Sequence, residues 1–292
     1  MDWLQALILG IIQGLTEFLP VSSSGHLIIG KELLGMEITD NIAFETVVHC
    51  ATVLSTITIL RKEIVTLFLK FFKLQWNPET QYICMILLSM VPVMIVGLFF
   101  KETVEHFFGE GLTLVGVMLL VTAFLLTLTS IINKSHTVAQ GVAQGVAQGV
   151  ARNAPTVYRT PHTAHRNISW GSAFLMGIAQ AVAVLPGLSR SGATIATGLL
   201  AGVKKEDVAK FSFLMVLIPI LGETFLGALK GDFSAAASGI PATSLLIGFF
   251  AAYICGCFAC KFMIELVKRT NLIWFAIYCS IVGIIALIYS LC

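Results

Sequence analysis

The segment LPVSSSGH at residues 19–26 interrupts a long apolar stretch with three serines and a histidine. A second break, SRSG at residues 189–192, follows another Leu-Pro pair and begins 167 residues after Ser22. Polar and charged side chains at membrane depth are costly, and an arginine at the centre of a spanning helix costs about 2.5–3.5 kcal/mol. The two breaks therefore predict a functional site.

Composition places the chain in the membrane. Its 292 residues are 57% hydrophobic and only 12% charged, with a mean hydropathy of +0.91. A soluble domain is closer to one quarter charged, so we expect an all-α polytopic membrane protein. The net charge of +2 by itself says nothing about a nucleic-acid partner, but the positive charges are split among loops rather than gathered into a basic face, so we expect none. Cys255, Cys257 and Cys260 lie inside an apolar span, where we expect packing rather than metal binding.

Six apolar windows are long enough to cross a bilayer, since a spanning helix needs about 20 residues. Two further apolar segments contain a polar break, and the helix on each side of that break is too short to cross the bilayer. At 1.5 Å per residue, a twelve-residue half-helix covers only about 18 Å. We interpret residues 3–35 and 170–203 as re-entrant helical hairpins. The six predicted spans are 43–60, 81–100, 112–133, 210–229, 241–260 and 271–291.

The basic residues predict the orientation. If the 61–80 loop is cytoplasmic, the order of the spans places 134–169, 204–210 and 261–270 on the same side. These four segments hold fourteen of the 18 Lys and Arg residues. The pattern predicts that both termini lie outside.

The chain also shows an internal repeat at an offset of 167 residues. Residues 1–133 form the first repeat and 170–292 the second, each with one hairpin and three spans. Because three is odd, the second repeat should enter the membrane inverted, which places a site at the interface between the repeats. The matching residues are Gly10, Ile11, Gln13, Ser22, Ser24, Gly25, Ile28, Phe44 and Leu54 with Gly177, Ile178, Gln180, Ser189, Ser191, Gly192, Ile195, Phe211 and Leu221.

Residues 134–169 between the repeats have a different composition. Val-Ala-Gln-Gly occurs three times over 138–149, followed by a polar stretch with Pro155 and Pro161. Glycine at every fourth position disfavours a helix. We predict a low-complexity cytoplasmic loop, and we do not expect its histidines (His136, His162 and His165) to be site residues.

The first hairpin carries a carboxylate, serines and a histidine in one short stretch. Gln13 and Glu17 are one helical turn apart and share a face. A serine close to His26 and Glu17 suits nucleophilic catalysis, because a base activates the hydroxyl. Ser22, Ser23 and Ser24 also begin a helix, whose free N–H groups bind phosphate. The alternative is a capped helix break with a buried, hydrogen-bonded histidine.

The second hairpin supplies a cation. Arg190 offers a rigid fork of donors that matches phosphate oxygens. It lies at another expected helix start, and the alternative is a structural salt bridge to Glu17. Together the two hairpins predict a site for an anionic ligand, with a phosphate-bearing lipid as the best candidate. The second hairpin's candidate binding residues are Gly187, Ser189, Arg190, Ser191 and Thr194.

Three other ionisable residues lie in predicted spans. Glu45 is a candidate to line the site, because an intramembrane carboxylate is functional by default. His49, one turn later, and Glu223, near the outer end of its span, are weaker candidates.

These motifs resemble the undecaprenyl-diphosphate phosphatase family, also called the bacitracin-resistance family. The resemblance rests on Gln13-x-x-x-Glu17, on PVSSSGH at 20–26, and on PGxSRSxxT at 186–194. It also includes Phe44 and Glu45, and it covers the chain except for the 134–169 loop.

The resemblance implies that the protein removes a phosphate from the C55 prenyl diphosphate at the outer face of the bacterial cytoplasmic membrane. This reaction recycles the lipid carrier for the cell wall and lowers bacitracin sensitivity. Ser23 is then the nucleophile, a choice that spacing alone does not make. His26 or Glu17 takes its proton, and Arg190 holds the diphosphate. A divalent cation (Mg²⁺ or Ca²⁺) is also implied, with Glu17 and Gln13 as candidate ligands. Oligomeric state stays open, a homodimer included.

Two rival functions are considered. Inverted repeats with broken helices are typical of transporters, so a flippase for prenyl phosphates is the alternative. The acid-phosphatase-like lipid phosphatases also use Ser-Gly-His and Ser-Arg. They require a histidine downstream of that arginine, and no histidine follows Arg190 here.

Overall fold

The computed structural model of the chain describes residues 1–36, 42–73, 75–100, 111–150, 168–230 and 239–291. Its described residues form twelve helices and no strand, which confirms the all-α prediction. The helices of the first half are α1 (Trp3–Thr16), α2 (Ser23–Leu33), α3 (Ile42–Ile59), α4 (Arg61–Phe71), α5 (Pro78–Phe99) and α7 (Gly111–Val150). Those of the second half are α8 (Trp170–Val182), α9 (Arg190–Leu200), α10 (Lys205–Met215), α11 (Leu217–Lys230), α13 (Ala242–Arg269) and α14 (Ile273–Leu291).

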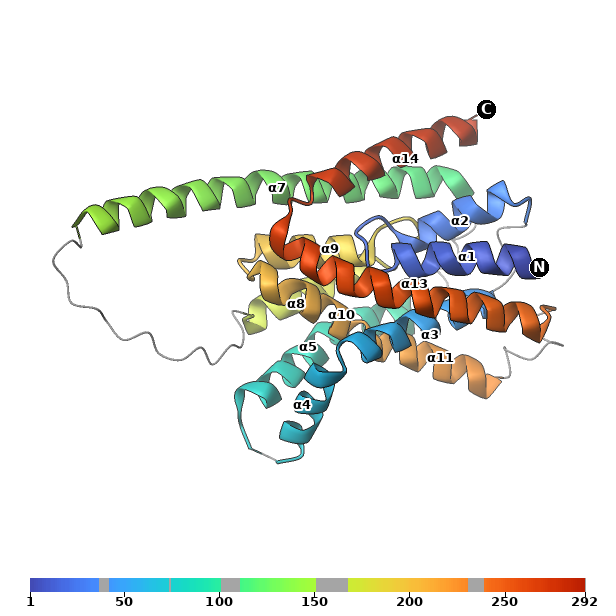
Figure 1. The fold of residues 1–292 in the computed structure, drawn as a ribbon, viewed down its shortest axis with the longest axis horizontal. Coiled ribbons are helices and arrows are strands. Elements are labelled where there is room, and N and C mark those ends of the chain that lie inside the picture. Colours follow the sequence, from blue (N-terminus) through green and yellow to red (C-terminus); the bar gives the residue numbers. More distant parts are fainter. Residues whose placement is uncertain (37–41, 74, 101–110, 151–167, 231–238, 292) are drawn as a thin grey trace.

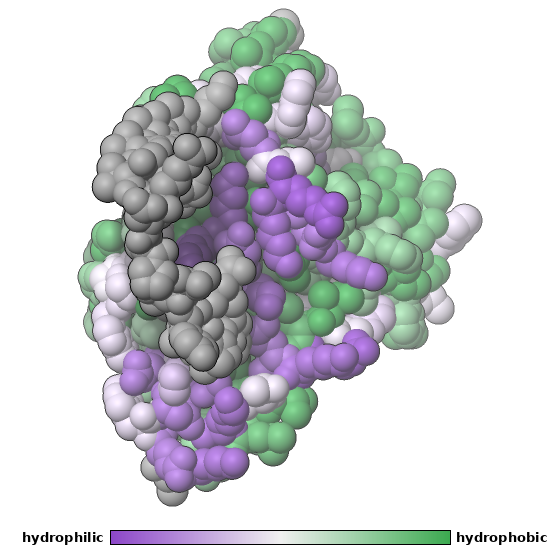
Figure 2. Space-filling view, turned by 60° about the vertical axis from the view of Figure 1, so that its left-hand side comes forward, coloured by the Kyte–Doolittle hydropathy of each residue, from purple (hydrophilic) through white to green (hydrophobic). Residues whose placement is uncertain are grey.

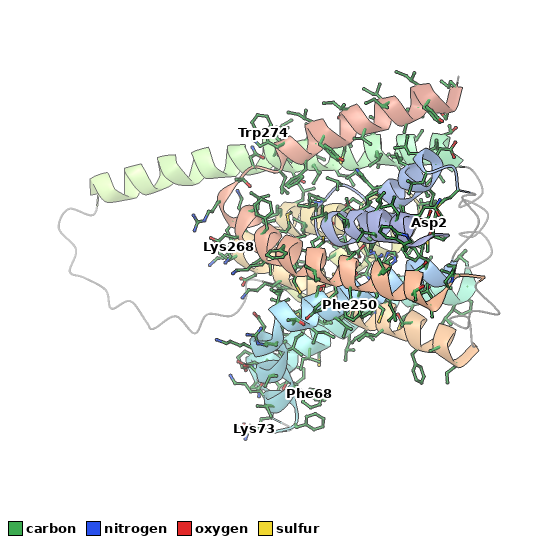
Figure 3. The ribbon with its side chains drawn as sticks, turned by 45° about the vertical axis from the view of Figure 1, so that its right-hand side comes forward. Asp2, Phe68, Lys73, Phe250, Lys268 and Trp274 are labelled. Atoms are coloured by element: carbon green, nitrogen blue, oxygen red, sulfur yellow. The ribbon has the colours of Figure 1, made fainter. Side chains whose placement is uncertain are left out.

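Within the described ranges, five helical segments are long and apolar enough to cross a membrane, and a sixth exists if the bent α3–α4 pair is one span. The protein is therefore a multi-pass membrane protein. Many large apolar side chains are exposed, among them Phe250 of α13 and Trp274 near the start of α14 (labelled in Figure 3), as expected for surfaces that face lipid. Hydrophilic surface gathers at one end of the molecule, between apolar flanks (Figure 2).

The two short hairpins pack against the longer helices. α1 and α2 occupy the end that carries both chain termini, whereas α8 and α9 lie toward the opposite end, where α4 also lies (Figure 1). α1 packs along α13, and α8 packs along α5, so each half covers the hairpin of the other half. The inversion of the complete repeats and the side of the membrane that each end faces stay predictions.

Close backbone approach makes this packing possible. A Cβ atom added to Gly14 of α1 would lie 2.6 Å from the carbonyl oxygen of Ala252 on α13. In lipid, helices associate through van der Waals contact, and small residues allow that contact. Glycine is therefore required at this position to hold the first hairpin against α13.

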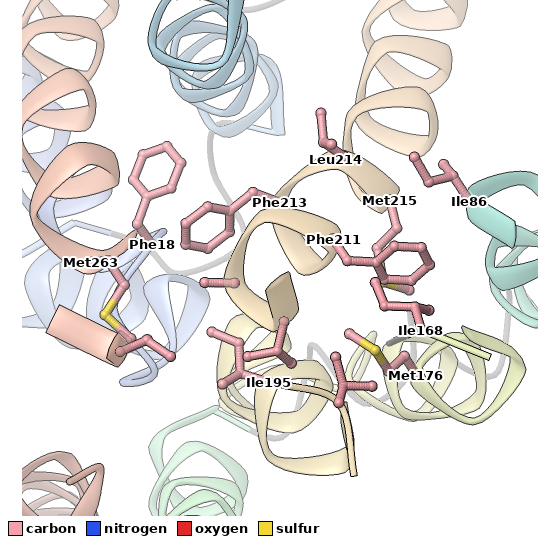
Figure 4. Close-up of a cluster of buried hydrophobic side chains, with 14 of the residues drawn as sticks. Phe18, Ile86, Ile168, Met176, Ile195, Phe211, Phe213, Leu214, Met215 and Met263 are labelled. Carbon is pink, nitrogen blue, oxygen red and sulfur yellow. The ribbon is translucent and has the colours of Figure 1, made fainter. Parts of the chain in front are cut away.

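The largest buried apolar cluster is built around α10 and contacts both hairpins, through Phe18 of the first and through Met176 and Ile195 of the second. Phe18, just after α1, meets Phe213 of α10 edge to face, with ring centroids 5.3 Å apart (Figure 4). Tyr82 of α5 meets Phe211 of α10 in the same way at 5.4 Å. The alternating Phe residues of α10 thus join the first hairpin to α5.

Several predicted element boundaries differ from the structure. The 61–80 segment, expected as a loop, contains α4, which bends by 77° away from α3. The predicted 210–229 span lies within one candidate span, Lys205–Leu229. A single turn residue, Val216, divides it into α10 and α11, because Pro219 lacks an N–H and lies in the first turn of α11.

The helix at the end of the first half is longer than expected. α7 continues through the Val-Ala-Gln-Gly tandem to Val150. Propagating an existing helix is easier than nucleating one, and alanine and glutamine favour helix enough to offset the glycines. His162 and His165, and the side chains of His136 and Glu223, lie outside the described residues.

Candidate active site

The tip of the first hairpin has an unusual backbone. Ser22 caps α2, and its hydroxyl accepts a hydrogen bond from the Gly25 N–H at 3.2 Å. Its φ angle is +70°, a value that non-glycine residues rarely adopt. Such conformations cost about 1–3 kcal/mol and concentrate at functional sites. The turn directs the neighbouring Ser23 back toward the end of α1.

Glu17 is the centre of the polar cluster. The Ser23 hydroxyl donates to Glu17 Oε2 at 2.5 Å, and Gln13 Nε2 donates to the same oxygen at 2.9 Å. His49 of α3 places Nε2 3.6 Å from that oxygen. The sequence predicted the proximity of Gln13 and Glu17 from helical spacing. His49, a weak candidate in the sequence, thus belongs to this cluster.

The second hairpin contributes Arg190, the first residue of α9. Its Nη2 lies 3.8 Å from Glu17 Oε1. The Arg190 side chain is 31% exposed, and its guanidinium has five N–H donors, so it retains donors for another anion. Ser189 caps α9 by accepting the Gly192 N–H at 3.0 Å. The positive charge and the start of a helix therefore coincide, which favours phosphate.

Direct hydrogen bonds hold the two hairpin tips together. Ser191 donates to the Leu19 carbonyl at 2.9 Å, and the Gly187 N–H donates to Ser24 at 3.4 Å. Gly187 has a φ of +87°, and a Cβ there would lie 2.7 Å from the Cα of Val115 on α7. Gly187 and these serines thus fix the relative position of the tips.

A small cavity with both polar and apolar lining residues lies beside Glu17 and Arg190. It provides about 20 Å³ for the centres of water molecules, enough for about one water. Thr194 on its wall bonds Ser212 at 2.6 Å. The lining residues are Glu17, Phe18, Thr52, Val53, Thr56, Gln180, Arg190, Ser191, Thr194, Ser212, Phe213, Val216 and Ile220.

His26 is placed differently from the expectation. Its Nδ1 is 2.8 Å from the Ser22 carbonyl oxygen, and its Nε2 is 2.7 Å from the hydroxyl of Tyr278 on α14. The two rings also stack at 5.6 Å. Because both ring nitrogens are used, no hydrogen bond among the described residues joins His26 to Ser23 or Glu17. Tyr278, 252 residues away, had no signal in the sequence.

Other predicted residues have structural partners. Glu45 pairs with the buried Lys31 at 2.5 Å and is not among the residues that line the cavity. Ser22 and Ser189 act as helix caps, and Thr194 bonds the backbone oxygen of Arg190 at 2.8 Å as well as Ser212. Gln180, which also lines the cavity, was noted only as the repeat partner of Gln13.

The cluster contains oxygen ligands of the kind that Mg²⁺ and Ca²⁺ prefer. Gln13 is fully buried, and no donor among the described residues reaches its Oε1. With the carboxylate of Glu17, this oxygen fits a hard cation. No group of three His, Cys, Asp or Glu side chains within the described ranges forms a complete metal site. A cation here would need further oxygens from water or from a phosphate.

These features define a class: a multi-pass helical membrane protein whose hairpins hold a serine, a carboxylate and an arginine together for chemistry on an anionic group. Comparison with known proteins agrees with this class. The family model described as bacitracin resistance protein BacA matches residues 6–285. The chain belongs to this family.

Individual relatives match this chain over nearly its whole length. Undecaprenyl-diphosphatases of Bacteroides fragilis and Parabacteroides distasonis are each 51% identical, over 99% and 100% of this chain and 99% of their own lengths. The undecaprenyl-diphosphatase of Methanobrevibacter smithii is 35% identical over 100% of this chain and 99% of its own length.

Proposed function

We propose that this protein hydrolyses undecaprenyl diphosphate to undecaprenyl phosphate and phosphate, and so recycles the lipid carrier of cell-wall synthesis. The observation that carries the proposal is the Ser23–Glu17 hydrogen bond of 2.5 Å beside Arg190. Full-length similarity to proteins named undecaprenyl-diphosphatase supports the same reaction. Family membership also supports a link to bacitracin resistance, because that antibiotic binds the diphosphate.

The two hairpin tips bind the diphosphate. Arg190 and the N-termini of α2 and α9 direct positive charge and N–H groups toward one region. The contacts that join the tips keep these donors in place before substrate arrives. Such preorganised donors stabilise the charge that develops during phosphoryl transfer.

Ser23 is the nucleophile, and Glu17 is its base. The serine proton already points at Glu17 Oε2, so proton loss needs no rearrangement. Attack of Oγ on the terminal phosphorus breaks the bond to the bridging oxygen. Undecaprenyl phosphate then leaves, and it takes up the proton that Glu17 accepted. Arg190 neutralises charge on the phosphoryl group in the loose transition state.

His26 has a positioning role. Since the Ser22 carbonyl accepts a hydrogen bond only, Nδ1 carries a proton, and Nε2 of the neutral ring accepts from Tyr278. The ring therefore links the first turn of α2 to α14 of the other half. Loss of this link would move the helix N-terminus that holds phosphate.

A divalent cation is part of the proposal. Glu17 and Gln13 Oε1 would hold it, together with phosphate oxygens or water. When bound, the cation supplies additional neutralisation of phosphate charge.

The predicted orientation gives the site access from outside. Both termini lie at the end opposite Lys73 and Lys268 (Figures 1 and 3). If those lysines are cytoplasmic, the first hairpin enters from the outer side and receives substrate there.

The direct test is phosphate release from undecaprenyl diphosphate by protein purified in detergent. Detergent removes any transmembrane gradient, so a transporter would release no phosphate. We expect wild-type turnover and a loss of at least about 1,000-fold in Ser23→Ala, since nucleophile removal leaves only binding effects. Ser280→Ala on α14, whose hydroxyl bonds its own helix at Ala276, is the matched control. Near-wild-type turnover in Ser23→Ala would remove Ser23 from the mechanism.

A further inference from the structure

Gln180 is a buried amide whose carbonyl oxygen lacks a donor. It lies on α8 with 2% of its surface exposed, and no donor among the described residues reaches its Oε1. An unsatisfied buried acceptor is destabilising and requires an explanation, such as a ligand or an ordered water. The reaction proposed above does not use this oxygen in its first step.

The surroundings of Gln180 restrict what could supply the missing donor. Gln180 lines the cavity that Glu17 and Arg190 also line. The cavity has about 20 Å³ for water centres, above the 10–15 Å³ that one water needs. The oxygens of an ionised phosphate would face another acceptor at Gln180 Oε1, whereas a water can donate a proton to it. A single water fits both the size and the hydrogen-bonding character.

The cavity also offers such a water several polar partners. Besides Gln180, the residues on its wall include Glu17, Thr52 and Thr56. The hydroxyl groups of both threonines donate to backbone carbonyls of their own helix, so they can act only as acceptors toward a water. A stably held water makes two to four hydrogen bonds. Glu17 is the key partner, because the same carboxylate holds Ser23 at 2.5 Å. A water in this cavity would therefore share the Glu17 carboxylate with Ser23, the proposed nucleophile.

We propose that Gln180 positions the water that hydrolyses a phosphoserine formed at Ser23. The inference rests on the proposed function and concerns its second half. Gln180 Oε1 accepts one water proton and orients the oxygen, while Glu17 removes the other proton. The water oxygen bonds to phosphorus, the bond between phosphorus and Ser23 Oγ breaks, and Glu17 returns its proton to Oγ. The proton facing Gln180 stays on the released hydrogen phosphate, so serine and carboxylate are regenerated.

The two repeat-related glutamines thus have different tasks. Gln13 donates its Nε2 proton to Glu17 at 2.9 Å. Gln180 has no carboxylate at the corresponding place, because the residue at the 167 offset from Glu17 is Val184. A neutral amide suits water positioning, since it orients the water without adding negative charge beside a phosphorylated serine.

The test separates formation of the phosphoenzyme from its hydrolysis. Purified full-length protein is mixed with undecaprenyl diphosphate labelled in its terminal phosphate, quenched with acid, and examined for phosphate on Ser23. Gln180→Met has a side chain of similar length without the acceptor. For Gln180→Met we expect a stoichiometric burst of undecaprenyl phosphate and accumulation of phospho-Ser23. Phosphate release should be about 100-fold slower than in wild type, because a misplaced reactant costs about that factor. The midpoint of thermal unfolding of Gln180→Met should not fall below that of wild type, because the lost carbonyl oxygen had no protein donor.

Ser130→Ala is the matched control. Ser130 Oγ on α7 is another buried oxygen without a partner among the described residues, and it is not part of the cavity lining. This variant should show wild-type kinetics. If Gln180→Met does not fold, Gln180→Asn takes its place in the test. Its side chain is one methylene shorter, so the carbonyl no longer reaches the water, and this variant should also accumulate phospho-Ser23.

Three results would overturn the inference. One is slow turnover in the folded Gln180 variants without phospho-Ser23, when Ser23 is labelled in wild type. Another is unchanged phosphate release in those variants. Finally, if wild type never labels and Ser23→Ala stays active, the nucleophile of the proposed function fails together with the inference, a pattern distinct from the first two.

Discussion

Ser23 Oγ lies 2.5 Å from Glu17 Oε2, and the two residues belong to different helical segments of one hairpin. The contact depends on the Ser22 turn with its positive φ, which brings the start of α2 back to the end of α1. A serine so close to a carboxylate that also faces Arg190 at 3.8 Å is prepared for proton transfer beside a bound anion.

Glu17→Gln should reduce kcat by about 10²–10⁴-fold, the usual contribution of a general base. The amide still accepts a hydrogen bond from Ser23, so the protein should remain folded. Phosphate release in detergent measures the effect. Glu32→Gln, in the same hairpin, serves as control and should stay near wild type. Full activity of Glu17→Gln would require another base.

Arg190→Lys should be damaging although the charge is kept. A lysine ammonium cannot reproduce the two-donor fork of arginine. Loss of a hydrogen bond to a charged group costs about 1.5–3 kcal/mol, so we expect kcat/KM to fall by roughly 10- to 150-fold. Arg269→Lys, at the exposed Glu265 pair, is the matched control. Equal kinetics of Arg190→Lys and wild type would show that Arg190 acts only as a general positive charge.

Tyr278→Phe should lower turnover by about 2- to 10-fold, because it removes one neutral hydrogen bond worth about 0.5–1.5 kcal/mol. Since Tyr278 acts through His26, the double variant with His26→Asn should be no slower than His26→Asn alone. Tyr289→Phe, on the same helix, should be silent. Additive losses in the double variant would argue for independent roles.

Gly14→Ala should destabilise the fold. The added methyl would lie 2.6 Å from the Ala252 carbonyl oxygen and 2.7 Å from Cys255 Cβ, and overpacking costs about 1–3 kcal/mol. Gly97→Ala is the matched control, because nothing lies within 4 Å of a Cβ at Gly97. Thermal unfolding in detergent should show a lower midpoint for Gly14→Ala only. Equal midpoints would mean that α1 and α13 separate readily in detergent.

The helix architecture could be predicted from local signals. Apolar length predicted the spans, and proline followed by hydroxyl residues predicted both hairpin breaks at 19–26 and 185–192. The continuations of α7 to Val150 and of α13 to Arg269 could not, because a helix need not end where its apolar residues end. The α3–α4 bend also had no clear signal.

The site was only partly visible for a similar reason. Glu17 and Ser23 are close in sequence, and Arg190 matched a phosphate-binding pattern, so the structure brings together residues that had been singled out. The direction of His26 depends on Tyr278, and the lack of a donor at the buried carbonyl of Gln180 depends on which side chains surround it. Both are properties of long-range packing, which spacing does not encode.

The central claim is that Ser23, Glu17 and Arg190 form one phosphatase site. The most direct measurement is a structure of the protein with a non-hydrolysable analogue of undecaprenyl diphosphate. We predict that the terminal phosphorus lies about 3–3.5 Å from Ser23 Oγ, a near-attack distance, with Arg190 donating to its oxygens. A diphosphate bound away from both hairpin tips, with Ser23 out of reach, would contradict the account.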